Sequence, residues 1–181
     1  MKTDILKKIK HSLKDAMQTP QHPFKFFTLG TVGLNGLIKL RTVVLRNVDD
    51  DLNFTIYTDK RTKKLTHIRE NKSVSLLFYD PKEMIQVDIT AEAIVENNDE
   101  KLDKLWQKIP EHSKKNYLTE KTPGSEITHP DKITYTGNHK NFIAIYFKPK
   151  RIEYLELTEP KNIRIRFDKS EFGWDSTFVV P

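Results

Sequence analysis

The stretch Arg41-Thr-Val-Val-Leu-Arg46 decides how this sequence is interpreted, together with Tyr57-Thr-Asp-Lys-Arg-Thr-Lys-Lys64 and Ile85-Gln-Val-Asp-Ile89. The first and third stretches alternate as strands do, yet they carry Arg and Gln where a plain core strand carries Val or Ile. The second leaves a strand and enters a helix with four cations in the five residues from Lys60 to Lys64. These three stretches predict a ligand with an anionic phosphate at one end and a flat, hydrogen-bonding ring at the other.

The basic run is unusual for a helix start, because the helix dipole already leaves partial positive charge there. A solvated helix start is the plain alternative. Free backbone N–H groups, a Thr hydroxyl and cations at that position favour an anion site, since a bound phosphate offsets the repulsion.

Arg41 and Arg46 are predicted to lie on opposite faces of one strand, about 16 Å apart at ~3.3 Å per residue. A guanidinium flanked by Val43 and Leu45 is costly to bury without an anion. Gln86 both donates and accepts hydrogen bonds, which suits the mixed edge of a flavin-like ring.

Composition predicts one soluble globular domain spanning residues 1–181, with 36% hydrophobic and 31% charged residues. The absence of cysteine excludes disulfides and thiolate chemistry, and it fits a reducing, cytoplasmic setting. No apolar run approaches the ~20 residues of a membrane helix. The net charge of +6 leaves nucleic acid, an anionic membrane or a phosphorylated small molecule open as partners.

Hydrophobic periodicity predicts an amphipathic helix within residues 1–18 that packs on the domain, and helices over 62–71 and 99–117, the last interrupted at Pro110. Strands are expected over 24–29, 37–45, 54–58, 74–79, 84–95, 142–147, 151–157 and 163–167. Residues 118–140 have no clear period and are expected to form a long loop that is functional or poorly ordered. Many short strands with a few helices predict a mainly β (α+β) fold, a closed or split β-barrel with flanking helices.

Several site classes lack their sequence signals. There is no G-x-G-x-x-G, no P-loop and no G-x-S-x-G, so dinucleotide binding of the Rossmann type, NTP hydrolysis and the hydrolase elbow have no support. The six histidines lack H-x-H or H-x-x-x-H spacing, so no metal site is expected.

The three opening stretches, extended to Glu92, resemble the FMN-binding motifs of the pyridoxamine 5′-phosphate oxidase family. The likeness covers nearly the whole chain from His22, and the tail Trp174–Pro181 resembles that family's C-terminal strand. The resemblance implies an FMN-binding split β-barrel that works as a homodimer, with FMN at the subunit interface.

The same resemblance implies the roles of individual residues. Arg41, Lys63 and Lys64 would hold the FMN phosphate, helped by Thr62 and by Tyr57-Thr58. The backbone of Thr42, Val43, Val44 and Leu45 would lie along the ring, Gln86 would bond its edge, and Arg166 would reach the cofactor from the other subunit. Tyr117, Lys121 and Ser125 would grip a substrate phosphate, with Arg46 on the opposite side.

The sequence departs from the oxidases near its C-terminus. Asn162-Ile-Arg-Ile-Arg166 stands where the family has R-x-H-D-R, Leu155 stands where a Trp is expected, and Thr122-Pro-Gly124 replaces an Arg-Pro element. The chain therefore resembles the oxidase-related FMN-binding proteins more than the true oxidases, and Arg164 is the expected group on the substrate side.

Three functions follow as hypotheses. The first is an FMN-dependent oxidoreductase acting on a small substrate, phosphorylated or not. The second is a non-catalytic FMN-binding or sensing protein on the same barrel. The third, a nucleic-acid binder that uses Phe24-Lys-Phe-Phe27, is disfavoured because adjacent Phe26 and Phe27 point to opposite faces of a strand.

Overall fold

The computed structural model describes residues 1–137 and 140–181, so Asn138 and His139 lie outside the described part of the chain. The α-helices are α1 (Lys2–Gln18), α2 (Lys63–Glu70), α3 (Asp99–Gln107) and α4 (Glu111–Lys114), and the 3₁₀ turns are η1 (Pro23–Lys25), η2 (Lys115–Tyr117) and η3 (Pro130–Lys132). The strands are β1 (Phe26–Val32), β2 (Ile38–Val44), β3 (Asn47–Val48), β4 (Phe54–Asp59), β5 (Ser73–Asp80), β6 (Ile85–Val95), β7 (Phe142–Glu156), β8 (Ile163–Ser170) and β9 (Gly173–Phe178).

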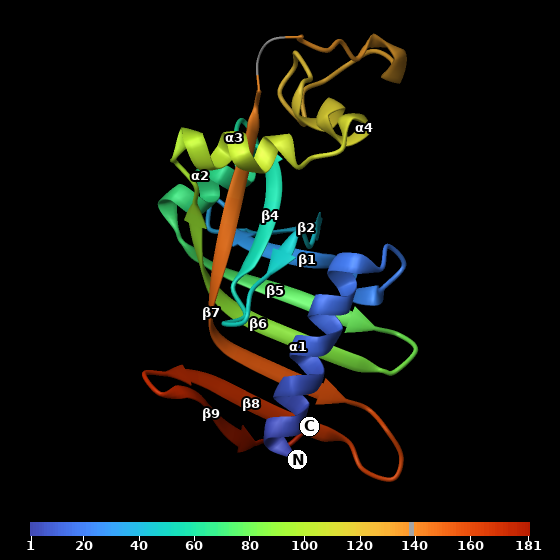
Figure 1. Ribbon diagram of the computed structural model, residues 1–181, viewed down its shortest axis with the longest axis vertical. Helices are drawn as coiled ribbons and strands as arrows, with labels where there is room; N and C mark the ends of the chain where they lie inside the picture. The colour runs from blue at the N-terminus through green and yellow to red at the C-terminus, as the bar shows by residue number, and fades with distance from the viewer. Residues whose placement is uncertain (138–139) are drawn as a thin grey trace.

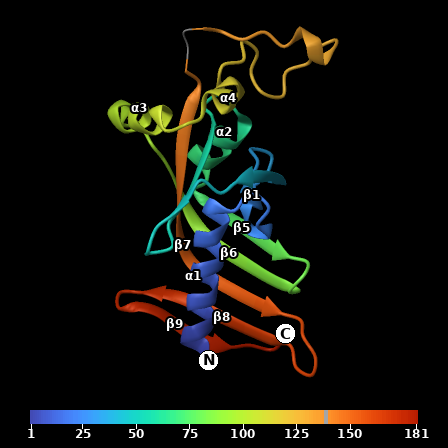
Figure 2. The same ribbon diagram turned by 45° about the vertical axis from the view of Figure 1, so that its right-hand side comes forward.

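Within the described residues, these strands form one antiparallel sheet in the order β2-β1-β5-β6-β7-β4-β3, with β8 and β9 continuing from β7. The sheet curls, so β2 at one end lies near β4, the neighbour of the last strand at the other end, as Figures 1 and 2 show. The barrel is therefore split between these two strands. The fold class predicted from the sequence, a mainly β split barrel with flanking helices, is confirmed.

Strand β7 joins the two parts of the sheet. Its first half pairs with β4 and its second half with β8, while β6 pairs along nearly its whole length. The sequence predicted two strands here, 142–147 and 151–157, with Lys148-Pro-Lys150 between them. The pairing of Ala91 with Pro149, next to a register shift at Thr90/Ala91, lets the strand continue through the proline.

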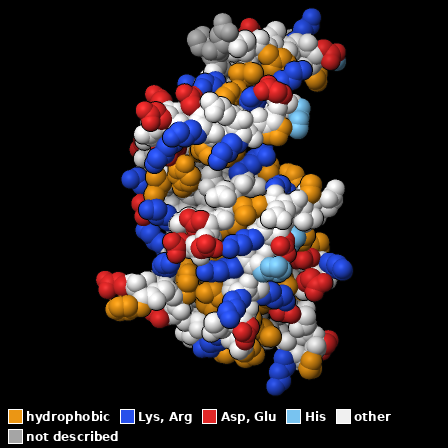
Figure 3. All heavy atoms as spheres, viewed as in Figure 1, with side chains coloured by type: hydrophobic (Ala, Val, Ile, Leu, Met, Phe, Trp, Pro, Cys, Tyr) orange, Lys and Arg blue, Asp and Glu red, His pale blue; other side chains and the backbone are white. Residues whose placement is uncertain are grey.

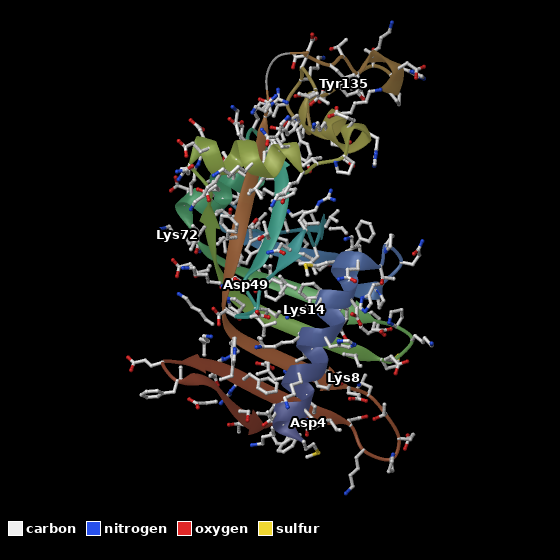
Figure 4. The ribbon with its side chains drawn as sticks, in the orientation of Figure 1. Asp4, Lys8, Lys14, Asp49, Lys72 and Tyr135 are labelled. Atoms are coloured by element: carbon white, nitrogen blue, oxygen red, sulfur yellow. The ribbon has the colours of Figure 1, made fainter. Side chains whose placement is uncertain are left out.

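Alternation along the strands separates an inner face from an outer face. Leu29, Leu76, Ile89 and Ile152 occupy matching positions on four adjacent strands, and each is fully buried. Helix α1 covers this inner side and buries Ile5, Ile9, Leu13 and Ala16 in the same core. The expected packing of the N-terminal helix on the barrel is thus observed, and Figure 4 shows Asp4, Lys8 and Lys14 along that helix.

Regular structure is interrupted at Pro110 and again after Val44. The helix expected over 99–117 is divided into α3, α4 and η2 at the predicted interruption. The N–H groups of Lys108 and Ile109 still donate to Leu105 (3.1 Å) and Trp106 (3.1 Å), and Pro110, which has no N–H, begins a new turn. Strand β2 ends at Val44, and the backbone N–H of Arg46 donates instead to Thr55 in β4 (2.9 Å). Arg41 and Arg46 therefore do not belong to one continuous strand.

No helix among residues 1–137 and 140–181 has the length and apolar character needed to cross a membrane. Among the same residues, no three His, Cys, Asp or Glu side chains are grouped in a way that could hold a metal ion.

Candidate functional site

A basic cluster forms where β2 faces the junction of β4 and α2; we define it as Arg41, Thr58, Thr62, Lys63 and Lys64. Arg41 points to the inner face and donates to the hydroxyl of Thr31 (2.8 Å) and the carbonyl of Leu29 (3.2 Å). Lys64 Nζ donates to the hydroxyls of Thr58 (2.8 Å) and Thr62 (3.3 Å). Two cations and two hydroxyls are thereby held beside the start of α2.

The positive charges of this cluster repel one another. Burial and the nearby Arg41, opposed by Asp59, together lower the pKa of Lys64 to about 8. Burial also lowers the pKa of Arg41. The carboxylate of Asp59 is held by Arg61, with Arg61 Nη2 2.7 Å from Asp59 Oδ2. The cluster thus has a local excess of positive charge that an anion would relieve.

The start of helix α2 adds hydrogen-bond donors to this cluster. Thr62 is the N-cap residue, but its hydroxyl donates to the carbonyl of Asp59 (2.9 Å) and does not cap the helix. First-turn backbone N–H groups of such a helix suit a phosphate, which accepts several hydrogen bonds at once. The residue chemistry therefore fits the phosphate end of FMN.

Two residues at this site carried no signal in the sequence. Thr31 of β1 and His67 of α2 are both buried and lie 3.0 Å apart through Thr31 Oγ1 and His67 Nδ1. Burial lowers the pKa of His67, with Arg41, Lys39 and Lys63 adding to the effect. Thr31 of this pair also accepts the hydrogen bond from Arg41. The register of β1 against β2 places Thr31 beside Arg41, and the packing of α2 against β1 brings His67 to Thr31, so the sequence pattern could not have identified them.

The residues expected along the flavin ring divide between the two faces of β2. Thr42 and Val44 lie on the outer face, whereas Val43 packs against the core and Leu45 is fully buried. Their shared backbone runs past the basic cluster.

Gln86 lies on the outer face of β6, whereas Arg41 lies on the inner face of β2, with β1 and β5 between the two strands. Within one chain these two side chains do not meet at a single ligand. The order of the strands in the sheet, which separates β6 from β2, could not be read from the sequence.

Gln86 belongs to an outer polar cluster with Asp88, Glu153 and Arg164, which line a small cavity of about 190 Å³. Asp88 lies directly opposite Glu153, and Arg164 Nη2 donates to Glu153 Oε2 (2.8 Å). Burial raises the pKa of Asp88, Glu153 raises it further, and Arg164 opposes both. Arg166 lies on the same face of β8 and donates to Asp168 (2.9 Å).

Arg46 lies beside an aromatic cluster on the outer side of β4. Its guanidinium carbon is 5.9 Å from the centre of the Tyr57 ring, and its Nε atom is buried with no hydrogen-bond partner in the described part of the chain. Burial raises the pKa of Tyr117, and Arg46 opposes that shift. Tyr117 packs edge-on against Phe142 and Trp106. The structure thus brings Arg46 and Tyr117 together, and the orphaned Nε suits an anionic or carbonyl acceptor.

Lys121 and Ser125 lie apart from Arg46 and Tyr117, in a hollow within the loop of residues 118–137. The hollow has a volume of about 340 Å³ and is lined by hydroxyls, by apolar side chains such as Ile127 and Tyr135, and by the cations Lys115, Lys121 and Lys132. The four expected substrate residues therefore form two groups in the structure. Figure 3 shows this loop as a lobe at one end of the molecule.

Apolar side chains also gather on the outer face of the first strands. Ile38 and Leu40 of β2 are 70% and 68% exposed, and Phe26 of β1 is 55% exposed. Leu77 and Tyr79 of β5 extend the patch toward Gln86. Contiguous apolar surface of this kind marks a protein–protein contact more often than free surface.

The family model described as pyridoxamine 5′-phosphate oxidase matches residues 13–154. No curated protein matches the sequence.

The chain is similar in structure to a pyridoxamine 5′-phosphate oxidase-related, FMN binding protein from Nostoc punctiforme PCC 73102 (20% identity, 96% of each chain, TM-score 0.77). It is also similar to PhzG from Burkholderia lata 383, solved with tetrahydrophenazine-1-carboxylic acid (17% identity, 97% of this chain and 92% of that one, TM-score 0.79). A third similar structure is that of a Clostridium acetobutylicum protein related to general stress protein 26 of B. subtilis (16% identity, 91% of this chain and 95% of that one, TM-score 0.62). At these identities the likeness shows the fold.

Proposed function

Because this chain belongs to the pyridoxamine 5′-phosphate oxidase family, we propose that it binds FMN and acts as an FMN-dependent oxidoreductase on a small substrate, phosphorylated or not. The observation that carries the proposal is the basic cluster, where Arg41 and Lys64 share a half-buried site while the carboxylate that acts on Lys64, Asp59, is held by Arg61. A phosphate dianion supplies the missing negative charge.

In this proposal the chain binds the cofactor at both the phosphate and the ring. Arg41, Lys63 and Lys64 hold the phosphate with the hydroxyls of Thr58 and Thr62, and the backbone of residues 42–45 runs along the ring. Bound flavin supplies the redox chemistry, and fixed positive charge near it favours the reduced, anionic ring.

The ring end of the site is proposed to need a second copy of the chain. Gln86 and Arg166 lie on the outer face, away from the inner-face Arg41. A homodimer packed through the exposed patch around Ile38 and Leu40 would present Gln86 and Arg166 of the partner subunit to a cofactor held by the first subunit. FMN at the subunit interface would account for both the half-buried cations and the apolar outer face.

The substrate side is proposed to use Arg46 and Tyr117, with Arg164 from the outer face and with Lys121 and Ser125 from the loop. Arg46 offers a buried Nε that has no hydrogen-bond partner among residues 1–137 and 140–181, and the aromatic cluster provides a flat apolar wall beside it. A small aromatic or phosphorylated substrate fits this combination of charge and aromatic surface.

A small-molecule substrate is favoured over nucleic acid. Phe26 is exposed and Phe27 is 2% exposed, so the two point to opposite faces and offer no one-sided stacking strand. The absence of cysteine fits a reducing compartment, and we place the proposed activity in the cytoplasm.

The proposed function is tested first by the absorption spectrum of the purified protein with added FMN. Anaerobic mixing of the flavin complex with pyridoxamine 5′-phosphate or another small amine should then bleach the flavin band, because electrons pass from the amine to the flavin. A complex that binds FMN but is bleached by none of these amines would favour the non-catalytic alternative.

The affinity for FMN should depend on pH through Lys64. Its pKa of about 8 lies below the ordinary 10.5, and a bound phosphate stabilises the protonated amine. Below pH 8 the charge is already present. Above pH 8 binding must take up a proton, so affinity should fall by up to about tenfold per pH unit. Fluorescence titration with FMN between pH 7 and 9.5 measures this.

The Lys64→Arg variant is the matched control for that titration, because a guanidinium stays charged throughout this range. Its FMN affinity should be nearly flat with pH. A wild-type affinity that is equally flat would place Lys64 outside the phosphate site.

Replacing Arg46 with alanine should spare FMN and weaken the handling of a phosphorylated substrate. One charge-assisted contact of about 1.5–3 kcal/mol is lost, so flavin bleaching by pyridoxamine 5′-phosphate should slow at least about tenfold. Bleaching by pyridoxamine, which lacks the phosphate, should change little and serves as the control. Loss of FMN in this variant would mean that the roles of Arg41 and Arg46 are exchanged.

A further inference from the structure

Arg61 lies in the basic run, yet its guanidinium points away from the basic cluster. It binds the carboxylate of Asp59 through Nε (3.1 Å) and Nη2 (2.7 Å). The same guanidinium donates to the carbonyls of Thr119 (2.7 Å) and Glu120 (2.8 Å) and to the hydroxyl of Thr119 (3.2 Å). One side chain therefore connects the β4–α2 turn to a segment 58 residues later in the sequence.

The turn that Arg61 holds is the one that carries part of the basic cluster. Asp59 is 4% exposed, and its carbonyl accepts from both the N–H (3.2 Å) and the hydroxyl (2.9 Å) of Thr62. Thr58 immediately precedes it and Lys64 bonds to both threonines. Any displacement of Asp59 would be transmitted to these groups.

The segment that Arg61 holds is one arm of the loop of residues 118–137. The two arms are cross-linked by hydrogen bonds from Glu120 N to Thr134 O (3.0 Å), from Thr136 N to Leu118 O (2.8 Å) and from Thr134 Oγ1 to Glu120 Oε2 (2.6 Å). Fixing one arm therefore fixes the other. Tyr135, labelled in Figure 4, lies on the second arm in the lobe that contains the hollow.

We infer that Arg61 is a positioning residue, which ties the loop of residues 118–137 to the turn of residues 59–62 and thereby fixes the hollow of Lys121 and Ser125 relative to the basic cluster. It neutralises Asp59, so the charge of Lys64 stays available to an anion, and it is not itself a phosphate ligand. That this tether helps to place a substrate rests on the proposed function. The attachment of the loop by Arg61 does not depend on that function.

The hydrogen bonds of Arg61 to Asp59, Thr119 and Glu120 require the planar guanidinium of an arginine. A guanidinium donates from five N–H groups in a fixed plane, so it reaches a carboxylate on one edge and backbone carbonyls on the other. A lysine ammonium is a single point of charge and cannot span both sides at once. The Arg61→Lys variant consequently separates neutralisation of Asp59 from attachment of the loop.

Limited trypsin digestion of the full chain tests the tether, with cleavage after Lys121 and Lys132 as the readout for the loop. The Arg61→Ala variant should be cut there at least about tenfold faster than the wild type, because local opening no longer breaks these hydrogen bonds. The exposed Arg69 of α2 provides the matched control, and Arg69→Ala should be cut at the wild-type rate.

Two further measurements exclude a general loss of structure. The Arg61→Lys variant should recover the Tm of the wild type, because Asp59 is again neutralised, while loop cleavage stays fast. FMN affinity should stay within about threefold of wild type in Arg61→Lys, since the basic cluster is intact.

Three results would overturn the inference. One is cleavage of Arg61→Ala at the wild-type rate. Another is restoration of loop protection by lysine. The third is a loss of FMN affinity in Arg61→Lys as large as that caused by removing Lys64. If the wild type itself does not bind FMN, the proposed function fails, and the cleavage rates still decide whether Arg61 is the tether.

Discussion

Replacing both Arg41 and Lys64 with methionine should lower the affinity for FMN by roughly 10²–10⁴-fold while the barrel still folds. Each substitution removes a charge-assisted contact to the phosphate of about 1.5–3 kcal/mol, and every ~1.4 kcal/mol is a factor of ten in affinity. Methionine retains most of the apolar length of both side chains, so the loss is mainly one of charge. Quenching of flavin fluorescence during titration measures the affinity.

The exposed Lys104 of α3 offers a control in which the same type of charge is removed elsewhere. Lys104→Met should bind FMN as the wild type does, which separates a specific contact from the general effect of a net charge of +6. An unchanged affinity in the double variant, with a normal circular dichroism spectrum, would exclude the basic cluster as the phosphate site.

Introducing aspartate at both Ile38 and Leu40 should convert the protein to monomers and lower FMN affinity by at least about tenfold. Both side chains are exposed in the single chain, at 70% and 68%, so the substitutions need not disturb its core. Buried in a dimer, two unpaired carboxylates per subunit would cost several kcal/mol, which is enough to separate the subunits. Light scattering coupled to gel filtration reports the mass, and FMN titration reports the second effect.

The link between the two effects is the specific part of this prediction. Gln86 and Arg166 lie on the face opposite Arg41, so a monomer would keep the phosphate end of the site and lose the ring end. Phe172, which is 98% exposed in the turn between β8 and β9, provides the control, and Phe172→Asp should change neither the mass nor the affinity. Monomers with wild-type FMN affinity would refute an interfacial site.

The alternation of apolar and polar residues was the signal from which most strands of the fold could be predicted. Alternation in residues 85–89 placed Ile85, Val87 and Ile89 on one face, and all three are buried. Strand β7 was missed as one element because Pro149 interrupts the pattern. The partner strand tolerates the proline through a local register shift, which is a property of the pairing and not of the β7 sequence.

The site was only partly predictable for a related reason. Thr62 and Lys64 could be grouped with Thr58 because they are neighbours in the sequence. The approach of Arg41 to Lys64 depends on barrel closure, and the separation of Gln86 from Arg41 depends on strand order. Arg61 could not be distinguished from Lys63 by composition, since its partners in the loop lie 58 and 59 residues away.

The central claim is that the basic cluster binds a phosphoryl group, and comparison of FMN with riboflavin tests it most directly. The two ligands share the ring system, and riboflavin lacks the phosphate. Titration of the purified protein at pH 7 should show FMN bound at least about 100-fold more tightly, corresponding to two lost charge-assisted contacts. Equal affinities for the two flavins, or binding of neither, would contradict this account.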